Sequence, residues 1–210
     1  MMDKDSVAAA IRGAFARTPY PGDPFLVGST EGCEPEEEAG AFRGLTDWRE
    51  IDAAFLDGHY VALSFFSEGA FRFFLPAFML ADLEGGLLTA DPVGELTGGF
   101  SELSIEVEAG GRTFTRRSGG ACLLNPRRYG AMTFGDYSRM RLSVFTREEA
   151  AAIVAYLEYR GETDDSGSSR AAIAVALDRF WRERARSAPP AAALDAHVAD
   201  DESYFRALRP

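Results

Sequence analysis

One segment of the chain, residues 67–84, is apolar on nearly every side when it is drawn as a helix, and this constrains the fold most. A surface helix carries a single apolar stripe, whereas a helix that is apolar all round is buried. Ser67, at its start, is a residue type that caps helix N-termini. The sequence therefore predicts a buried central helix from Ser67 to Glu84. Its apolar residues are Phe71, Phe73, Phe74, Leu75, Phe78, Met79, Leu80 and Leu83.

Arg72 and Pro76 interrupt this apolar pattern. Pro76 has no backbone N–H, so the carbonyl of Arg72 loses its helical partner and the helix is expected to kink. One interpretation is a pocket at the kink, lined by Trp48 and Phe66, in which Arg72 holds an anionic ligand. The other interpretation, which is favoured because buried charges are usually paired, is an ion pair between Arg72 and a carboxylate. A closed environment around Arg72 that contains such a carboxylate would argue against the pocket.

Further helices are expected on both sides of the central one. Val7, Ile11 and Phe15 recur at helical spacing near the start of the chain. Residues 146–149 form a capping box that opens a second amphipathic helix, and Ile173 begins the apolar face of a third. A chain of 210 residues suits one domain. We expect a single globular domain over residues 1–186 with a helical core (1–85 and 146–186), and a linker and tail with a short helix over 187–210.

Residues 99–145 have the pattern of strands. Apolar and polar residues alternate at Leu103, Ile105 and Val107, two glycines at 110–111 are typical of a hairpin turn, and residues 139–145 alternate again. This segment predicts a small antiparallel sheet. The predicted fold class is therefore α+β: a mainly helical domain around a buried central helix, with a small antiparallel β-sheet from the middle of the chain.

The charge of the chain bears on its partners. Its net charge is -11, which disfavours binding to nucleic acids because phosphate backbones are repelled. Two cysteines and two histidines supply neither a disulfide framework nor a clustered metal site, so we expect no metal and no cofactor. No uncharged apolar run is long enough for a membrane span, and no signal peptide is evident, so a cytoplasmic location is expected.

Arginines are concentrated in the middle of this acidic chain. Seven arginines and one aspartate lie between residues 109 and 141, which leaves a net charge of -17 over the rest. Arg127 and Arg128 follow an Asn-Pro turn and are candidates for bidentate binding of a phosphate or carboxylate. The favoured alternative is that the arginines cover the outer face of the sheet and pair with acidic helices.

The central helix also resembles a known signature. Residues 71–78 read Phe-Arg-Phe-Phe-Leu-Pro-Ala-Phe, preceded by Ser67 and Ala70, and this run resembles the A-F-R-[YF]-[YF]-L-P-A-[YF] helix motif of an uncharacterised bacterial domain-of-unknown-function family. The turn at residues 20–23 and Trp48 also match features of that family, as does a late capped helix. Gly69 and the stretch 99–141 depart from its pattern. The family has no assigned activity, so the resemblance implies an organisation and no reaction.

Two functional hypotheses follow. The favoured one is a non-enzymatic protein-binding protein, of the immunity-like or scaffold kind, with a basic protein as its partner, because an acidic surface speeds association with basic proteins. The alternative is a small-molecule-binding protein or enzyme whose anionic ligand is held by Arg72 near Pro76.

Overall fold

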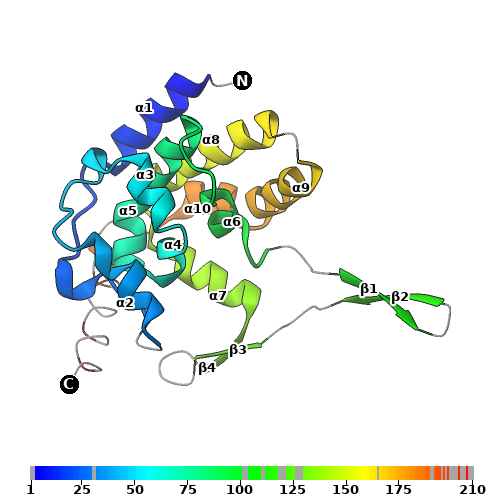
Figure 1. The fold of residues 1–210 in the computed structure, drawn as a ribbon. Helices are drawn as coiled ribbons and strands as arrows, with labels where there is room; N and C mark the ends of the chain where they lie inside the picture. Colours follow the sequence, from blue (N-terminus) through cyan, green and yellow to red (C-terminus); the bar gives the residue numbers. More distant parts are fainter. Residues whose placement is uncertain are drawn as a thin grey trace.

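The computed structural model describes residues 3–29, 32–100, 134–164 and 166–189, isolated positions beyond 191, and the backbone alone of four strands between 104 and 133. Helices dominate the described chain (Figure 1). The α-helices are α1 (Lys4–Phe15), α2 (Glu34–Glu38), α3 (Ala53–Gly58), α4 (Ala62–Phe65), α5 (Glu68–Leu83), α6 (Pro92–Thr97), α7 (Phe134–Arg141), α8 (Arg147–Thr163), α9 (Gly167–Ala176) and α10 (Arg182–Ser187). Short 3₁₀ turns are η1 (Asp23–Phe25), η2 (Gly40–Phe42), η3 (Trp48–Glu50) and η4 (Leu142–Val144), and η5 (Leu177–Trp181) is a π-helical turn that joins α9 to α10.

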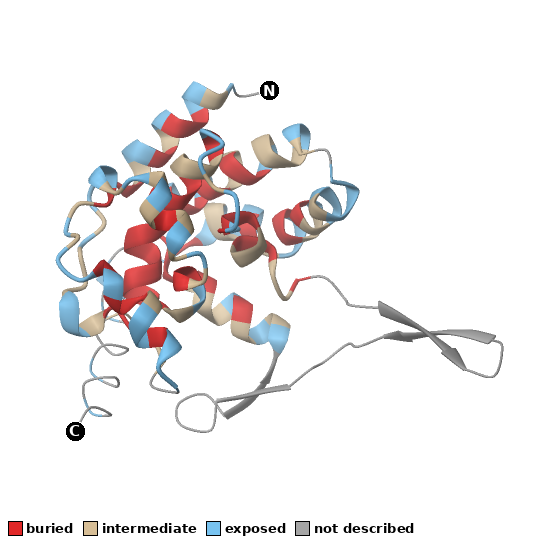
Figure 2. Cartoon of the chain, viewed as in Figure 1, coloured by how far each residue is buried: buried red, intermediate tan, exposed pale blue. Residues whose placement is uncertain are grey.

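The predicted central helix is confirmed as α5. Ser67 caps it by accepting a hydrogen bond from the N–H of Ala70, and Glu84 ends it. Every residue from Glu68 to Met79 is buried, which is what an all-round apolar sequence requires. Pro76 lies in the helix interior. Figure 2 shows α5 as an almost continuous buried element among helices that are buried on one side only.

The rings on one side of α5 gather around Phe42. Its ring lies 4.9 Å from those of Phe66 and Phe74, 5.0 Å from that of Phe55 and 6.2 Å from that of Phe78. Burial of a phenylalanine stabilises a fold by about 1.5–3 kcal/mol, and ring pairs in these orientations add to that. This cluster joins η2, α3 and α5 into one core.

The N-terminal and C-terminal helices cover the other side of α5. Val7, Ile11 and Phe15 form the fully buried face of α1, as their spacing predicts, and α1 packs against both α5 and α8. The predicted capping box at the start of α8 is also confirmed, with Thr146 and Glu149 as its two members. Trp181 from η5 is fully buried and donates its indole N–H to the carbonyl of Leu96, 2.8 Å away, which ties η5 to α6.

The predicted α+β class is wrong. Where side chains are described, the chain is all-α, with ten helices, 72% helix, 1% strand and no sheet. An isolated bridge joins Val27 to Phe66. In the predicted β-rich segment the backbone carries two separate pairs, β1 (Ser104–Ala109) with β2 (Arg112–Arg117) and β3 (Cys122–Asn125) with β4 (Gly130–Thr133). Their side chains lie outside the described residues.

Residues 139–145 show why the alternation was misleading. They form the end of α7 and the turn η4, where Leu142 and Phe145 are both buried. In a tight helical turn, residues three apart share a face, so this segment buries its apolar residues without a strand. Arg141, which a strand would have pointed away from the core, instead stacks on Phe71, with its guanidinium carbon 4.5 Å from the ring centroid.

Candidate functional site

Arg72 lies in the most buried ion pair of the described residues. Its Nε donates to both carboxylate oxygens of Glu149, at 2.8 Å and 3.1 Å, and the two side chains are only 6% and 2% exposed. Glu149 is the third residue of α8, and the capping box fixes it, because its carboxylate accepts the N–H of Thr146 at 2.7 Å. The capping box at the start of α8 thus also orients the Glu149 side chain toward Arg72 on α5.

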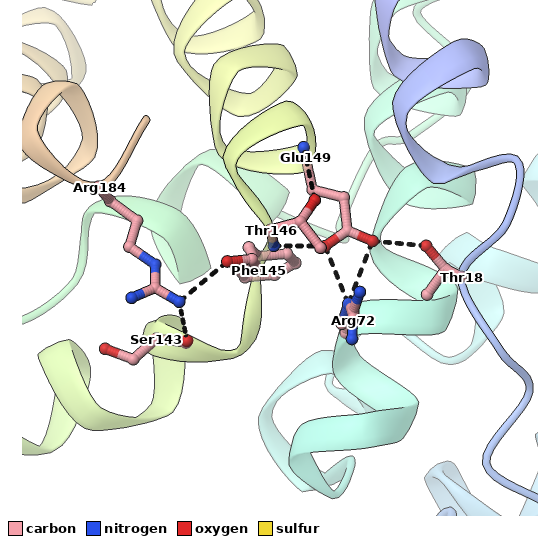
Figure 3. Close-up of polar contacts among 7 residues, drawn as sticks. All are labelled: Thr18, Arg72, Ser143, Phe145, Thr146, Glu149 and Arg184. Atoms are coloured by element: carbon pink, nitrogen blue, oxygen red, sulfur yellow. Dashed lines mark hydrogen bonds and ion pairs between the residues drawn. The ribbon is translucent and has the colours of Figure 1, made fainter. Parts of the chain in front are cut away.

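The carboxylate of Glu149 is fully occupied. One oxygen accepts from Arg72 and from the hydroxyl of Thr18 at 2.7 Å, and the other accepts from Arg72 and from the N–H of Thr146. An ionised carboxylate offers about four acceptor positions, and the protein's own donors make four hydrogen bonds to this one. Figure 3 shows these contacts converging from the segment after α1, from α5 and from α8. The arrangement links three elements of the fold.

Arg184 places a second guanidinium beside this pair. It donates to the carbonyl of Phe145 at 2.9 Å and to the carbonyl of Ser143, as Figure 3 shows. Burial lowers the pKa of Arg184, and the neighbouring charge of Arg72 lowers it further. Its Nε is buried and has no hydrogen-bond partner among the described residues. Arg184 therefore fastens α10 to the turn before α8, at an electrostatic cost.

Phe66, one of the two aromatic residues proposed for the pocket, lies away from Arg72. Phe66 stacks on Phe74 at 5.1 Å, in the ring cluster around Phe42. Arg72 and Phe74 are two residues apart, which is about 200° around a helix, so they lie on opposite faces of α5. Trp48 is buried on η3, which packs against α5. The structure thus places Phe66 in the core and directs Arg72 toward α8. The surroundings of Arg72 are closed and contain the carboxylate of Glu149, which argues against the predicted anion pocket.

The predicted arginine site is only partly described. Arg127 and Arg128 lie outside the described residues. Of the same arginine-rich stretch, Arg141 donates to Glu95 Oε2 at 2.9 Å and to the carbonyl of Leu63, and Arg139 lies over the ring of Phe100 at 5.6 Å. Arg141 therefore pairs with a carboxylate of α6, whereas Arg139 packs on an aromatic ring.

His59 and Glu38 form a second polar contact, between α2 and the end of α3. His59 Nδ1 lies 3.5 Å from Glu38 Oε2, and among the described residues neither atom has a hydrogen-bond partner. The imidazole packs against the rings of Phe55 and Phe42, at 4.8 Å and 5.9 Å. The aromatic contacts account for the position of this histidine as part of the core.

A third polar group, which the sequence did not indicate, joins α5 to α8. The fully buried Tyr156 donates its hydroxyl to Asp82 Oδ2 at 2.5 Å, and Arg160 Nε lies 3.2 Å from the same oxygen. Burial raises the pKa of Asp82 above its ordinary value of 3.8, against the opposing effects of Tyr156 and Arg160. Burial also raises the pKa of Tyr156.

The raised pKa of Asp82 predicts a pH-dependent stability. Because the folded state binds the proton more tightly than the unfolded state, the free energy of unfolding falls as the pH rises from 3.8 through the folded pKa. Asp82→Asn removes this titration and keeps an acceptor for Tyr156. Urea unfolding across that range should show the variant gaining stability relative to the wild type as the pH rises. Tyr156→Phe should steepen the fall in unfolding free energy with pH, because the hydrogen bond from Tyr156 opposes the raised pKa of Asp82. A difference in unfolding free energy between the wild type and Asp82→Asn that stays constant with pH would contradict the assignment.

Comparison with known proteins adds no assignment to these groups. No family model, curated protein or solved structure matches the chain. The resemblance of α5 to the helix motif therefore stays a prediction. Among the described residues, no three metal-ligating side chains gather in one place, and no helix there has the length and hydropathy of a membrane span.

Proposed function

We propose that this chain is a non-enzymatic protein-binding protein, of the immunity-like or scaffold kind, whose partner is a basic protein. The observation that carries the proposal is the charge of the described surface from residue 32 to residue 58. This stretch contains eight acidic residues and two arginines. A surface with such a charge steers basic proteins toward it and raises their association rate.

The arginines of this stretch are held locally. Arg43 pairs with Glu36 and Arg49 with Asp47, both within the stretch itself. Glu34, Glu37 and Glu50 are exposed, and none of the three forms an ion pair with another described residue. Their charges therefore face solvent and are available to a cationic partner.

Affinity capture with charge-reversed baits tests this function. The wild-type chain should retain a basic protein at low salt and release it as salt is raised, because exposed charges are screened by ions. A bait with Glu34→Lys, Glu37→Lys and Glu50→Lys should retain much less of it. A control bait with Glu148→Lys, Glu162→Lys and Asp178→Lys has the same net charge and should retain it nearly as well as the wild type.

Two results would contradict the proposal. One is that no protein is recovered above background at low salt. The other is that the retained protein is acidic, or is retained equally by both reversed baits, since the acidic stretch would then play no part in the interaction.

A further inference from the structure

The loop between α5 and α6 displays a leucine to solvent. Leu88 is 92% exposed, whereas the other large exposed hydrophobic side chains among the described residues, Tyr60 and Phe134, are 49% and 45% exposed. On either side of it, Leu87 is packed against the core and Ala90 is buried. The loop is thus anchored at Leu87 and Ala90, while the apolar side chain of Leu88 is exposed.

One carboxylate fixes the backbone of this loop. Asp57 Oδ1 accepts the N–H groups of Leu88, Thr89 and Ala90, at 2.9 Å, 2.7 Å and 2.9 Å. These amides hold the pKa of Asp57 below its ordinary value. Three consecutive residues bound to one oxygen lose most of their backbone freedom, so Leu88 is held in place before any partner arrives. A loop whose backbone is fixed in this way loses less entropy on binding.

The loop also lies directly against α3. A Cβ at Gly86 would come within 2.8 Å of the Cβ of Ala53, so only glycine allows this approach. Ala53 and Asp57, one turn apart on α3, both face the loop. The adjacent positions on α3, Ala54 and Gly58, are exposed. We name these exposed positions the Leu88 surface. It consists of Leu88, Gly85, Gly86 and Thr89 from the loop and Ala54 and Gly58 from α3.

The Leu88 surface has an acidic rim. Asp52, Glu84 and Asp91 are exposed at its edges, and residues 52–58 and 84–91 contain no lysine or arginine. The cation that reaches this rim is Lys4, which pairs with Glu84 at 2.9 Å. A partner that covers Leu88 would therefore gain from cationic side chains placed around an apolar contact.

We propose that the Leu88 surface is the docking site for a basic amphipathic helix of the partner protein. The small residues at positions 54 and 58 of α3 allow a second helix to approach closely, and Leu88 inserts among its apolar side chains. Cations on the flanks of that helix face Asp52, Glu84 and Asp91. This inference rests on the proposed function and adds to it the place where the partner binds and the kind of segment that binds there.

Titration with a defined peptide tests the docking site. The probe is a short synthetic amphipathic helix of leucine and lysine, and the readout is the backbone amide NMR spectrum of the whole chain. The peptide should shift the amides of residues 54–58 and 84–91. Leu88→Asp should weaken its binding by about tenfold or more, because truncated central anchors cost that much. The control Ala174→Asp, an equal charge change on the exposed face of α9, should leave the affinity within about twofold.

A second variant tests whether the loop is held ready for binding. Asp57→Ala removes the acceptor and keeps Leu88, so hydrogen exchange at the amides of residues 88–90 should become faster and peptide affinity should fall by less than in Leu88→Asp. Unchanged affinity in Leu88→Asp, or shifts confined to α2, would overturn the docking site while leaving the proposed binding of a basic protein intact. Absence of peptide binding would also overturn it, and the capture experiment would then decide the function separately.

Discussion

Arg72→Met is expected to lower the free energy of unfolding by about 3–5 kcal/mol, because it leaves the charge of Glu149 buried without its cation. Methionine keeps most of the buried volume of the arginine stem, so the loss reports on the charge rather than on a cavity. Urea unfolding at neutral pH measures the change.

The matched control for this prediction is Arg49→Met. Arg49 pairs with Asp47 at 2.7 Å, but its side chain is 59% exposed, and exposed ion pairs contribute less than about 1 kcal/mol. A loss in Arg72→Met no larger than that of Arg49→Met would mean that the buried pair does not hold α5 to α8.

Phe42→Ala is expected to destabilise the fold by about 3–5 kcal/mol as well, through the cavity left among the rings. Phe42 is fully buried and lies at the centre of contacts with Phe55, Phe66, Phe74 and Phe78. These rings come from η2, α3 and α5 and from the residue that precedes Ser67, so they cannot all move to fill the space. Thermal and urea unfolding both measure the effect.

Leu88→Ala is the control for the ring cluster. Leu88 is almost fully exposed, so its truncation should change stability by no more than about 0.5 kcal/mol. A comparable loss in both variants would contradict the assignment of Phe42 as the centre of the core. The same measurement establishes that variants at Leu88 keep the fold, which the peptide titration requires.

The central helix could be predicted because a sequence that is apolar on every side is compatible only with a buried helix. No surface helix tolerates apolar residues on every side, and Ser67 marked its start. The capping box at Thr146 was an equally local signal, because it is defined by a threonine and a glutamate three positions later, Glu149. Signals of this kind depend on neighbours within one turn, and they were confirmed.

The fold class failed where local alternation was ambiguous. Leu142 and Val144 alternate as in a strand, whereas Leu142 and Phe145 are spaced as in a tight helical turn, and all three are buried. Contacts from distant parts of the chain decided between the two structures. Arg141 is held by Glu95 and by the ring of Phe71, residues 46 and 70 positions away, and no local pattern reports such contacts.

The candidate site shows the same limit. An ion pair between Arg72 and a carboxylate was expected, but the sequence indicated Glu149 only as a capping residue. Glu149 lies 77 positions from Arg72 in the sequence, so no local pattern could identify it as the partner. Asp57 gave no signal at all, because its role depends on three backbone amides of a loop more than 30 residues later.

Arg72 binds Glu149 and links α5 to α8, and a double-mutant cycle measures this most directly. Unfolding free energies of the wild type, Arg72→Met, Glu149→Gln and the double variant give the coupling between the two side chains. The buried geometry predicts a coupling of about 1–3 kcal/mol, with the double variant more stable than the two single losses together would allow. A coupling near zero would contradict it, since the pair would then contribute nothing to holding α5 to α8.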